Sequence, residues 1–525
     1  MPGVSSFRTT VTRVGPGALS GLLAGLTALA VAELTAALVR PAAGPVTVVG
    51  GAVIDRTPAP VKDFAIRTFG ENDKLVLQLG ILALLSLSAI GLGILAVRYR
   101  WAGAAGVLVF GLIGGAAALS RPDSAGTADV LPSVAGAVAG AAVLHLLANR
   151  ADDTGSPDRR GTGWSRRGFL NAAAATAAAA ATAGALGQVL SGQRGQGAVT
   201  SRNALRLPAP ASPAPAVPAG TRLKVDGISP FTTPVRDFYR VDTALTVPMV
   251  DAGTWRLRIH GKGVARPRSY TLEELLARPL IERDITLTCV SNEVGGPYLG
   301  NARWLGVRLA DLLAECGVRP PSKGGDADQL VARSVDGMTL GSPVEDVMDG
   351  RDAMLAVGMN GEPLPFDHGF PVRMLVPGLY GYVSACKWIA DIELTTFDAY
   401  DPYWVKRKWA RRAPVKTQSR IDTPKPFARP AAGPVVVAGV AWAQRRGITR
   451  VEVRIDDGPW QDADLAAQDT VDTWRQWSYR WNATPGGHTV TVRATDGTGQ
   501  VQTEQRARTI PDGASGRHSV FVTVP

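Results

Sequence analysis

Four long apolar runs dominate the first part of the chain. They cover residues 17–39, 74–97, 101–119 and 130–148, and each is close to the roughly 20 residues that a helix needs to cross a bilayer. A buried helix of a soluble protein is the alternative for any single run, but four in succession favour a membrane. Gly, Ala and Ser are abundant in them, which lets neighbouring helices approach closely. We therefore predict an all-α transmembrane bundle with four spans over residues 1–160.

Basic residues between the runs predict how these helices are oriented. Short loops rich in Arg and Lys stay on the cytoplasmic side of a membrane. Arginines lie before the first run, between the second and third, and after the fourth: Arg8, Arg13, Arg98, Arg100, Arg150, Arg159, Arg160, Arg166 and Arg167. These three regions are predicted to be cytoplasmic, and the segment 40–73 is predicted to face outward.

A twin-arginine-like motif follows the fourth run. The sequence SRRGFL at residues 165–170 precedes an alanine-rich run and resembles a twin-arginine export signal, which carries folded proteins that often contain their cofactor. We expect residues 161–192 to contain this motif and a fifth span. The Pro/Ala-rich residues 193–222 are then a semi-rigid linker. The prediction is a multi-pass protein of the plasma membrane, with everything after about residue 190 on the extracytoplasmic side.

From residue 223 the composition is that of an ordinary globular protein. Strand-like and helix-like segments alternate at residues 254–261, 271–279, 283–290 and 307–317, without a sustained βαβ period and without a GxGxxG sequence that opens a helix. This pattern predicts an α+β domain over residues 223–428. The net charge of +11 does not indicate nucleic-acid binding, since the basic residues flank apolar runs or form short clusters and no nucleic-acid-binding motif is present.

Cys289 lies at the end of an apolar strand-like run and precedes a glycine-rich turn in TCVSNEVGGPYLGNARWLGV, residues 288–307. Such a thiol can be a metal ligand, a nucleophile or a packing residue. A nucleophile needs a base that forms the thiolate, and no base stands beside Cys289 in the sequence, although a partner from elsewhere in the fold stays open. The other two cysteines, Cys316 and Cys386, are predicted to pack in the core; no CxxC or Cys/His zinc spacing occurs.

A second segment, residues 359–388, combines an irregular backbone with three cations. Its prolines and glycines oppose regular structure, and His368, Arg373 and Lys387 are donors suited to an anionic partner. Each alone is compatible with a capping or surface role. Together in a rigid, turn-rich segment they predict a cradle for a phosphate or a pterin.

The two segments together resemble the sulfite oxidase family of molybdopterin enzymes, from about residue 225 to the C-terminus. The resemblance implies one molybdenum ion held by a pyranopterin dithiolene and one protein thiolate, which Cys289 matches; a soft thiolate suits this metal. It also implies two-electron oxygen-atom transfer at the cofactor. Residues 237–248 resemble the family's first cofactor-facing segment. The residues that the resemblance assigns to cofactor binding are Tyr239, Asp242, Cys289, His368, Arg373 and Lys387, and those assigned to catalysis are Cys289, Arg240 and Trp409.

The last part of the chain, residues 429–525, reads as all-β. Apolar and polar residues alternate in VEVRI and HTVTVRA, and Asp-Gly and Gly-Gly turns separate the runs. The segment resembles the immunoglobulin-like β-sandwich that follows the catalytic domain of sulfite oxidases, which implies a homodimer formed through it. Its five tryptophans are predicted to be mostly core residues: Trp442, Trp460, Trp474, Trp477 and Trp481.

The substrate stays open at this point. Glu293 and Val294 stand where animal and plant sulfite oxidases place arginines, and Trp409 in WVKRKWARR is the aromatic residue closest to the position of their active-site tyrosine. An oxyanion oxidase, a reductase of S- or N-oxides such as methionine sulfoxide, and a non-catalytic membrane-tethered binding protein are the three alternatives. Only His145 lies in a predicted span, so no haem is predicted in this chain, and a separate electron carrier (a cytochrome or a quinone-linked protein) is expected.

Overall fold

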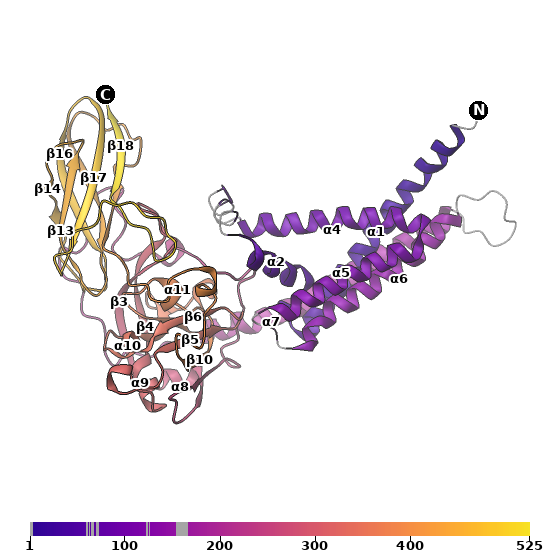
Figure 1. Cartoon of the computed structure of the whole chain (residues 1–525), viewed down its shortest axis with the longest axis horizontal. Coiled ribbons are helices and arrows are strands. Elements are labelled where there is room, and N and C mark those ends of the chain that lie inside the picture. The colour runs from indigo at the N-terminus through magenta and orange to yellow at the C-terminus, as the bar shows by residue number, and fades with distance from the viewer. Residues whose placement is uncertain are drawn as a thin grey trace. The chain divides into compact units, whose positions relative to one another are not determined.

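The computed structural model describes residues 4–58, 61, 64, 68–69, 73–121, 124, 126–153 and 166–525, and it divides into two compact units (Figure 1). The first unit contains residues 1–197 with the short segment 244–247, and the second contains residues 198–243 and 248–525. The predicted positions Ser165, Arg159 and Arg160 lie outside the described residues.

The first unit is helical, as its apolar runs predict. Its helices are α1 (Val4–Val39), α2 (Pro45–Arg56), α4 (Asp73–Arg98), α5 (Arg100–Ser120), α6 (Leu131–Asp153) and the first part of α7 (Arg166–Ala204). Five helical segments are long and apolar enough to cross a membrane, by length and composition. Small residues allow α1 and α4 to touch, since a Cβ atom added to Gly21 or Gly93 would collide with backbone of the other helix.

The segment assigned to the linker is more ordered than the sequence suggests. Helix α7 continues to Ala204, past the expected start of the linker at residue 193. Beyond it, Ser212 bridges Ile281 at the free edge of strand β3 (Leu280–Thr288): the Ser212 N–H donates to the Leu280 carbonyl at 3.1 Å, and Glu282 N–H donates to the Ser212 carbonyl at 2.9 Å. Proline lacks an N–H, so only the non-proline residues of this stretch can donate to the edge of the sheet, and Ser212 is one of them. The Pro/Ala stretch therefore lies along a sheet edge instead of standing free.

Two mixed or antiparallel sheets form the core of the domain that follows the linker, which confirms the predicted α+β class. One sheet has the order β2-β1-β10-β5-β6, in which β1 and β10 run parallel; the other has the order β3-β4-β7-β8, with β9 paired to β7. The bounds are β1 Arg256–Gly261, β2 Arg268–Thr271, β4 Leu299–Arg308, β5 Gln329–Ser334, β6 Thr339–Pro343, β7 Met354–Met359, β8 Glu362–Pro363, β9 Arg373–Leu375 and β10 Ile389–Thr395. Short helices connect them: α8 Leu272–Leu276, α9 Leu309–Glu315, α10 Val344–Met348 and α11 Gly381–Ser384.

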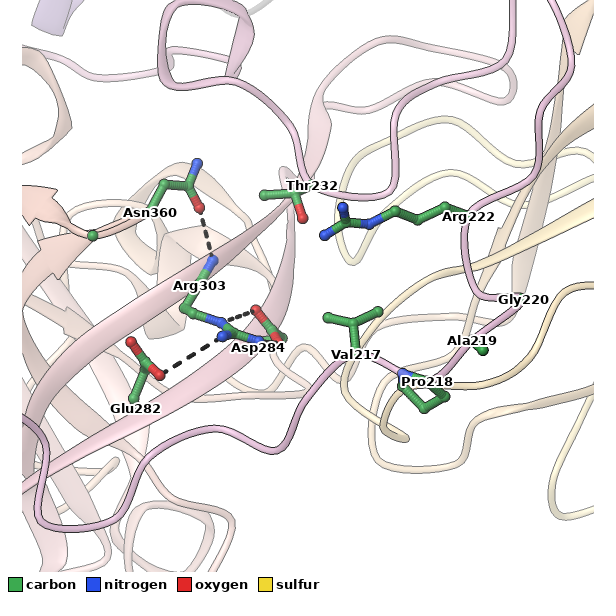
Figure 2. A pocket seen from close by; sticks show the side chains of 11 residues that line it. Val217, Pro218, Ala219, Gly220, Arg222, Thr232, Glu282, Asp284, Arg303 and Asn360 are labelled. Carbon is green, nitrogen blue, oxygen red and sulfur yellow. Dashed lines mark hydrogen bonds and ion pairs between the residues drawn. The ribbon is translucent and has the colours of Figure 1, made fainter.

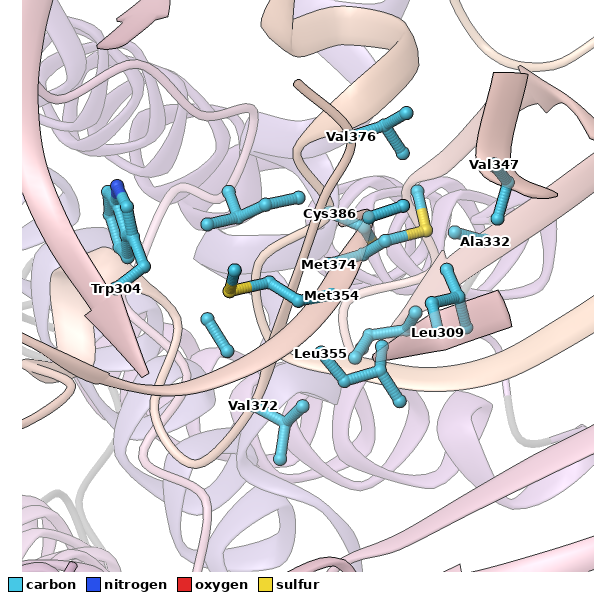
Figure 3. Packing of buried hydrophobic residues seen from close by; sticks show 14 of the residues in the cluster. Trp304, Leu309, Ala332, Val347, Met354, Leu355, Val372, Met374, Val376 and Cys386 are labelled. Atoms are coloured by element: carbon cyan, nitrogen blue, oxygen red, sulfur yellow. The ribbon is translucent and has the colours of Figure 1, made fainter. Parts of the chain in front are cut away.

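The interior of this domain is apolar and continuous. Figure 3 shows Trp304 of β4, Met354 and Leu355 of β7, Met374 of β9 and Cys386, all of which belong to one cluster of buried residues. Cys316 and Cys386 are buried free thiols inside this core, as predicted for packing residues. Burial of each large side chain of this core contributes about 1.5–3 kcal/mol to folding.

The C-terminal domain consists of two four-stranded antiparallel sheets around a second core. The orders are β11-β12-β16-β15 and β14-β13-β17-β18. Their bounds are β11 Gln418–Thr423, β12 Gly433–Trp442, β13 Ile448–Ile455, β14 Gln461–Asp462, β15 Asp464–Leu465, β16 Arg475–Ala483, β17 Gly486–Asp496 and β18 His518–Val524. Strand β11 pairs with β12, so this domain begins before the expected boundary at residue 429.

The tryptophans of this domain divide into two groups. Trp442, Trp474, Trp477 and Trp481 are buried, as predicted. Trp460 instead lies under three guanidinium groups, those of Arg454, Arg493 and Arg517, at 4.9, 4.3 and 5.1 Å from its ring centre. Cation–π contacts with these arginines stabilise an indole that lies outside the core.

Candidate functional site

Cys289 sits at the start of a closed loop that joins β3 to β4. Its N–H donates to the Tyr298 carbonyl at 2.9 Å, which ties the two ends of the loop together. The Asn292 N–H donates to the Cys289 carbonyl at 3.1 Å, and the Asn292 side-chain oxygen accepts from the Tyr298 N–H at 2.8 Å. The backbone on both sides of Cys289 is thus fixed, and the thiol is 8% exposed.

The surroundings of the Cys289 sulfur act in two directions. Burial raises the pKa of the Cys289 thiol, which opposes ionisation. The polar N–H and hydroxyl of Ser291 and the positive charge of Lys387 favour the thiolate and lower the pKa of the thiol. A metal cation bound to the sulfur would outweigh the burial effect. The loop therefore presents a buried sulfur that already has partners for its thiolate form.

Three cations converge from the turn-rich segment 359–388. His368 ends the 3-10 turn Phe366–His368, Arg373 begins β9, and Lys387 follows α11. Gly369, with φ of +108°, lets them meet, because an added Cβ there would lie 3.0 Å from the Lys387 Cα atom and 3.1 Å from the Arg373 Cβ atom. Arg373 Nη1 donates to the His368 carbonyl at 3.2 Å.

Burial sets the protonation of these cations. It lowers the pKa of Lys387 to about 8 and that of Arg373 to about 10. It also lowers the pKa of His368 to about 4, with the Arg373 charge as a second cause. A protein stabilises buried cations by pairing them with anions. Two buried cations with depressed pKa values, beside an imidazole that is neutral at pH 7, therefore indicate a site that is built to receive an anion.

Arg373 provides a second, independent sign of this. Its side chain is buried, and its Nε atom has no hydrogen-bond partner among the described residues. The guanidinium lies over the Trp304 ring, 5.1 Å from the ring centre, which fixes its plane. A buried donor without a partner costs about 1–3 kcal/mol or more, and a bound anionic group would remove that cost.

Residues 239–242 close the site from another direction. The Tyr239 side chain is partly buried, and burial raises the pKa of its phenol, with the Cys289 charge as a second cause. Asp242 accepts from Lys387 Nζ at 2.9 Å and from Arg240 Nε at 3.2 Å. The Arg240 side chain is 39% exposed, so it lies at the rim while Asp242 lies inside.

Six of the predicted residues thus lie in one neighbourhood: Tyr239, Asp242, Cys289, His368, Arg373 and Lys387, with Arg240 at its rim. Trp409 is placed differently. Its described contacts are with Tyr382 of α11 and with Trp404, at ring-centre distances of 5.4 and 5.7 Å, and not with Cys289 or the cations. Trp409 therefore packs behind α11.

Two residues of the site were not predicted from the sequence. Ser291 contributes its hydroxyl to the Cys289 sulfur. Tyr380, directly before α11, is buried; burial raises the pKa of its phenol, to which the Cys289 charge contributes. Consecutive Gly and Tyr residues in GLYGY (378–382) and the Cys-Val-Ser spacing are the only signals that the sequence offered.

The C-terminal domain holds the cysteine loop from outside. Arg420 of β11 donates to the Gly296 carbonyl at 2.8 Å, to the Ser229 hydroxyl at 2.8 Å and to Asp422 at 2.7 Å. The His518 ring lies against Gly295, whose φ of +81° and missing side chain make room for it. A cavity of about 370 Å³ opens beside this contact, lined in part by Gly295, Pro297 and Lys425.

A larger cavity of about 670 Å³ lies along the edge of β3 and β4. Figure 2 shows Arg303 between Asp284 and Glu282 on one side, with Arg222 and Val217 on the other. Arg303 pairs with Asp284 at 2.6 Å, and the Asn360 side-chain oxygen accepts from the Arg303 N–H at 2.9 Å. Cys289 is not among the residues that line either cavity.

Comparison with known proteins agrees with this geometry. The family model described as "Oxidoreductase molybdopterin binding domain" matches residues 244–404. Mitochondrial sulfite oxidase of Mus musculus is 31% identical over 277 residues, which cover 45% of this chain and 50% of the relative. Sulfite oxidase of Gallus gallus is 31% identical over 296 residues, which cover 48% of this chain and 63% of the relative. Nitrate reductase [NADH] 1 of Oryza sativa subsp. japonica is 34% identical over 199 residues, 34% of this chain and 21% of the relative.

The chain spans about half the length of most of these sulfite oxidases. Among solved structures, the sulfane dehydrogenase SoxCD from Paracoccus pantotrophus is 26% identical, with a TM-score of 0.49, over 57% of this chain and 82% of that chain.

The residues fit the cofactor that this family uses. The molybdenum cofactor has an anionic pterin phosphate and soft dithiolene sulfurs. Arg373 and Lys387 supply buried cations, one of them with an unsatisfied Nε donor, and Cys289 supplies a soft sulfur. The chain therefore contains a molybdopterin-binding oxidoreductase domain that is similar to those of the sulfite oxidases.

Proposed function

We propose that the chain is a membrane-anchored, extracytoplasmic enzyme that carries out two-electron oxygen-atom transfer on a small oxyanion of the sulfite type. The observation that carries this proposal is the buried Cys289 thiol at the end of β3, beside a buried cationic cradle with an unsatisfied Arg373 donor. Several relatives are named sulfite oxidase, which supports the substrate class.

Each residue has a role in this proposal. Cys289 holds the molybdenum through its sulfur, and Ser291 stabilises the thiolate. Arg373, Lys387 and His368 hold the pterin and its phosphate, while Tyr239 and Asp242 close the site around them. When bound, the cofactor supplies the two-electron oxygen-transfer chemistry.

Two further residues act at the edge of the site. The partly exposed Arg240 attracts the anionic substrate from the rim. Trp409, expected to touch the substrate, is instead assigned to supporting α11, because its described contacts lead to Tyr382 and Trp404.

The proposal is tested on the full chain purified in detergent. We expect sulfite to drive reduction of a neutral redox dye, with stoichiometric molybdenum in the protein. Molybdenum without sulfite turnover, combined with sulfoxide-dependent oxidation of a reduced dye, would replace the oxidase by a reductase. A metal-free native protein with neither activity would favour the non-catalytic binding protein.

The reductase of S- or N-oxides is the second candidate, and one observation favours it. Glu293 and Val294 follow Cys289 where arginines would receive a sulfite anion, so the cysteine loop itself contributes no cation to a substrate. A site that binds a neutral sulfoxide or N-oxide needs fewer positively charged side chains than a site that binds the sulfite anion.

The membrane orientation is also a proposal, supported by the five long apolar helices and by the arginines between them. We predict that alkaline phosphatase fused after residue 200 is active, since that enzyme folds only outside the cytoplasm. The same reporter fused at the α4–α5 junction, next to Arg98 and Arg100, should be inactive. The reverse pattern would contradict the model with five spans.

The two-sheet C-terminal domain is proposed to be immunoglobulin-like and to form a homodimer. An exposed aromatic pair on it supports an interface: Phe427 is 79% exposed and Phe521 is 44% exposed, with ring centres 6.4 Å apart. Exposed aromatic residues of this kind are enriched in protein interfaces.

Arg420 gives a prediction about cofactor retention. We expect Arg420→Met to raise the rate of molybdenum loss from the purified protein about tenfold, because the charge-assisted contact with Gly296 that fixes the cysteine loop disappears, together with the contacts with Ser229 and Asp422 that hold Arg420 in place. Molybdenum is measured by mass spectrometry after dialysis. Arg450→Met removes an exposed ion pair with Asp462 in the same domain and serves as the control. Equal rates of molybdenum loss in the two variants would contradict the role of Arg420.

A further inference from the structure

A basic segment lies on the surface of the catalytic domain and has no role in the proposed site. Residues 397–412 carry five basic side chains against two carboxylates, an excess of three positive charges. Lys406, Lys408, Arg411 and Arg412 are exposed. These residues form the basic surface discussed below.

Aromatic rings lie under three cations of this segment. Lys406 lies over the Tyr400 ring at 5.1 Å, Arg407 over the Tyr403 ring at 3.5 Å, and Arg412 over the Phe397 ring at 5.6 Å. Arg411 forms ion pairs with Asp401 at 2.9 Å and with Asp398 at 3.6 Å. Stacking on a ring fixes the position of a cation without neutralising its charge. The surface is thus ordered and remains positive.

A chain of rings lies beneath this surface and leads to the cofactor site. Tyr403 contacts Trp404 at 5.0 Å between ring centres, Trp404 contacts Trp409 at 5.7 Å, and Trp409 contacts Tyr382 at 5.4 Å. Tyr382 belongs to α11. At the start of α11, a Cβ added to Gly381 would lie 3.8 Å from the carbonyl oxygen of Thr288, the residue before Cys289, and 3.9 Å from the Tyr239 hydroxyl.

We infer that the basic surface is the docking site of a small acidic protein that carries one electron at a time. The inference rests on the proposed function. Oxidation of the substrate adds an oxygen atom from water, releases two protons to solvent and yields two electrons. Two molecules of the carrier then dock in turn, and each is reduced by one electron, which leaves the site along the ring chain under the surface.

The geometry favours a protein over the substrate anion as the occupant. A small anion is bound by donors that converge on one point, as in the buried cradle. The cations of the basic surface are instead spread along one exposed segment, and two of them, Lys406 and Arg412, each lie over a ring of their own. Distributed exposed charge steers a protein of opposite charge into contact and weakens as ionic strength rises.

The test measures binding of the full chain, in detergent, to two purified probes: an acidic c-type cytochrome and a basic one. We expect the acidic cytochrome to bind at least tenfold more tightly at low ionic strength, and this preference to shrink as salt is added. Lys406→Glu with Arg412→Glu should reverse the preference. Arg319→Glu with Lys323→Glu changes the charge by the same amount at exposed positions between α9 and β5 and should leave it unchanged.

Other outcomes overturn the inference. Equal loss of binding in both double variants would show an effect of net charge only. The surface would be assigned to a membrane if the wild-type chain bound vesicles of anionic lipid and Lys406→Glu with Arg412→Glu lost this binding but still bound the cytochrome. Binding does not require turnover, so these results stay separate from the proposed function. The docking site is supported if Lys406→Glu with Arg412→Glu reduces the dye normally but reduces the acidic cytochrome more slowly. If the wild-type chain does not reduce the dye, only the proposed function is refuted.

Discussion

Replacing Cys289 by alanine should abolish turnover, lowering it by more than 100-fold, while the chain still folds. Loss of a residue that only orients a metal ligand costs about 10–100-fold, and removal of the ligand itself costs more. Cys289→Ser retains the size of the side chain but replaces a soft sulfur by a hard oxygen, so it should be nearly as inactive. Molybdenum content and turnover are measured on the same preparation, and X-ray absorption at the molybdenum edge should show one sulfur ligand fewer.

Cys386→Ala is the matched control for this experiment. Cys386 is also a buried free thiol of the same domain, but its side chain packs among Met354, Met374 and Val376 (Figure 3). We expect this variant to lose about 1 kcal/mol of stability and to keep its molybdenum and activity. If Cys289→Ala retained wild-type turnover, or if both variants lost it equally, the assignment of Cys289 as the metal ligand would be wrong.

The local parts of the site were predictable because they are encoded in short segments. Cys289 at the end of an apolar strand, and the three cations in a proline- and glycine-rich segment, are visible in the sequence as runs of residue types. The strand β3 does end at Thr288, and Gly369 with its positive φ does bring Arg373 and Lys387 together. In these segments the residue that does the chemistry and the residues that shape the backbone are neighbours in the chain.

The parts that were not predicted depend on contacts between distant segments. Arg420 reaches Gly296 across more than a hundred residues, and nothing in the sequence around Arg420 indicates a partner in the cysteine loop. Ser212 is one small residue within a Pro/Ala stretch, yet it pairs with the edge of β3 because that edge has free hydrogen-bonding groups. Trp409 was predicted to be catalytic because of its position in the sequence relative to the active-site tyrosine of sulfite oxidases. In the fold its ring packs against Tyr382 of α11. Composition describes a segment alone and cannot specify the surface against which it packs.

Lys387 should make the cofactor-free protein more stable as the pH rises from about 8 to about 10.5. Burial lowers the pKa of Lys387 from its ordinary value of 10.5 to about 8. Between these values the unfolded chain binds more protons than the folded chain, so the free energy of unfolding rises with pH. The destabilisation caused by burying protonated Lys387 is complete below pH 8 and disappears above about pH 10.5. The full difference corresponds to about 3 kcal/mol.

We therefore expect the cofactor-free protein to be more stable at pH 9.5 than at pH 7.5, relative to Lys387→Met measured under the same conditions. The comparison with Lys387→Met removes the titration of all other groups. Unfolding is followed by tryptophan fluorescence, because all tryptophans except Trp101 and Trp164 lie after residue 250. An identical pH dependence in the two proteins would contradict a depressed pKa of Lys387.

Cofactor binding should remove this dependence, since an anion beside Lys387 stabilises its charged form and raises its pKa again. Loading at pH 9 should then take up close to one proton per chain, measured by calorimetry in buffers of different ionisation enthalpy. Asp242→Asn supplies a second check. The Asp242 carboxylate accepts from Lys387 and raises its pKa against the effect of burial, so this variant should begin to gain stability at a lower pH than the wild type. If proton uptake at pH 9 persisted unchanged in Lys387→Met, the cation that meets the cofactor would be a different one.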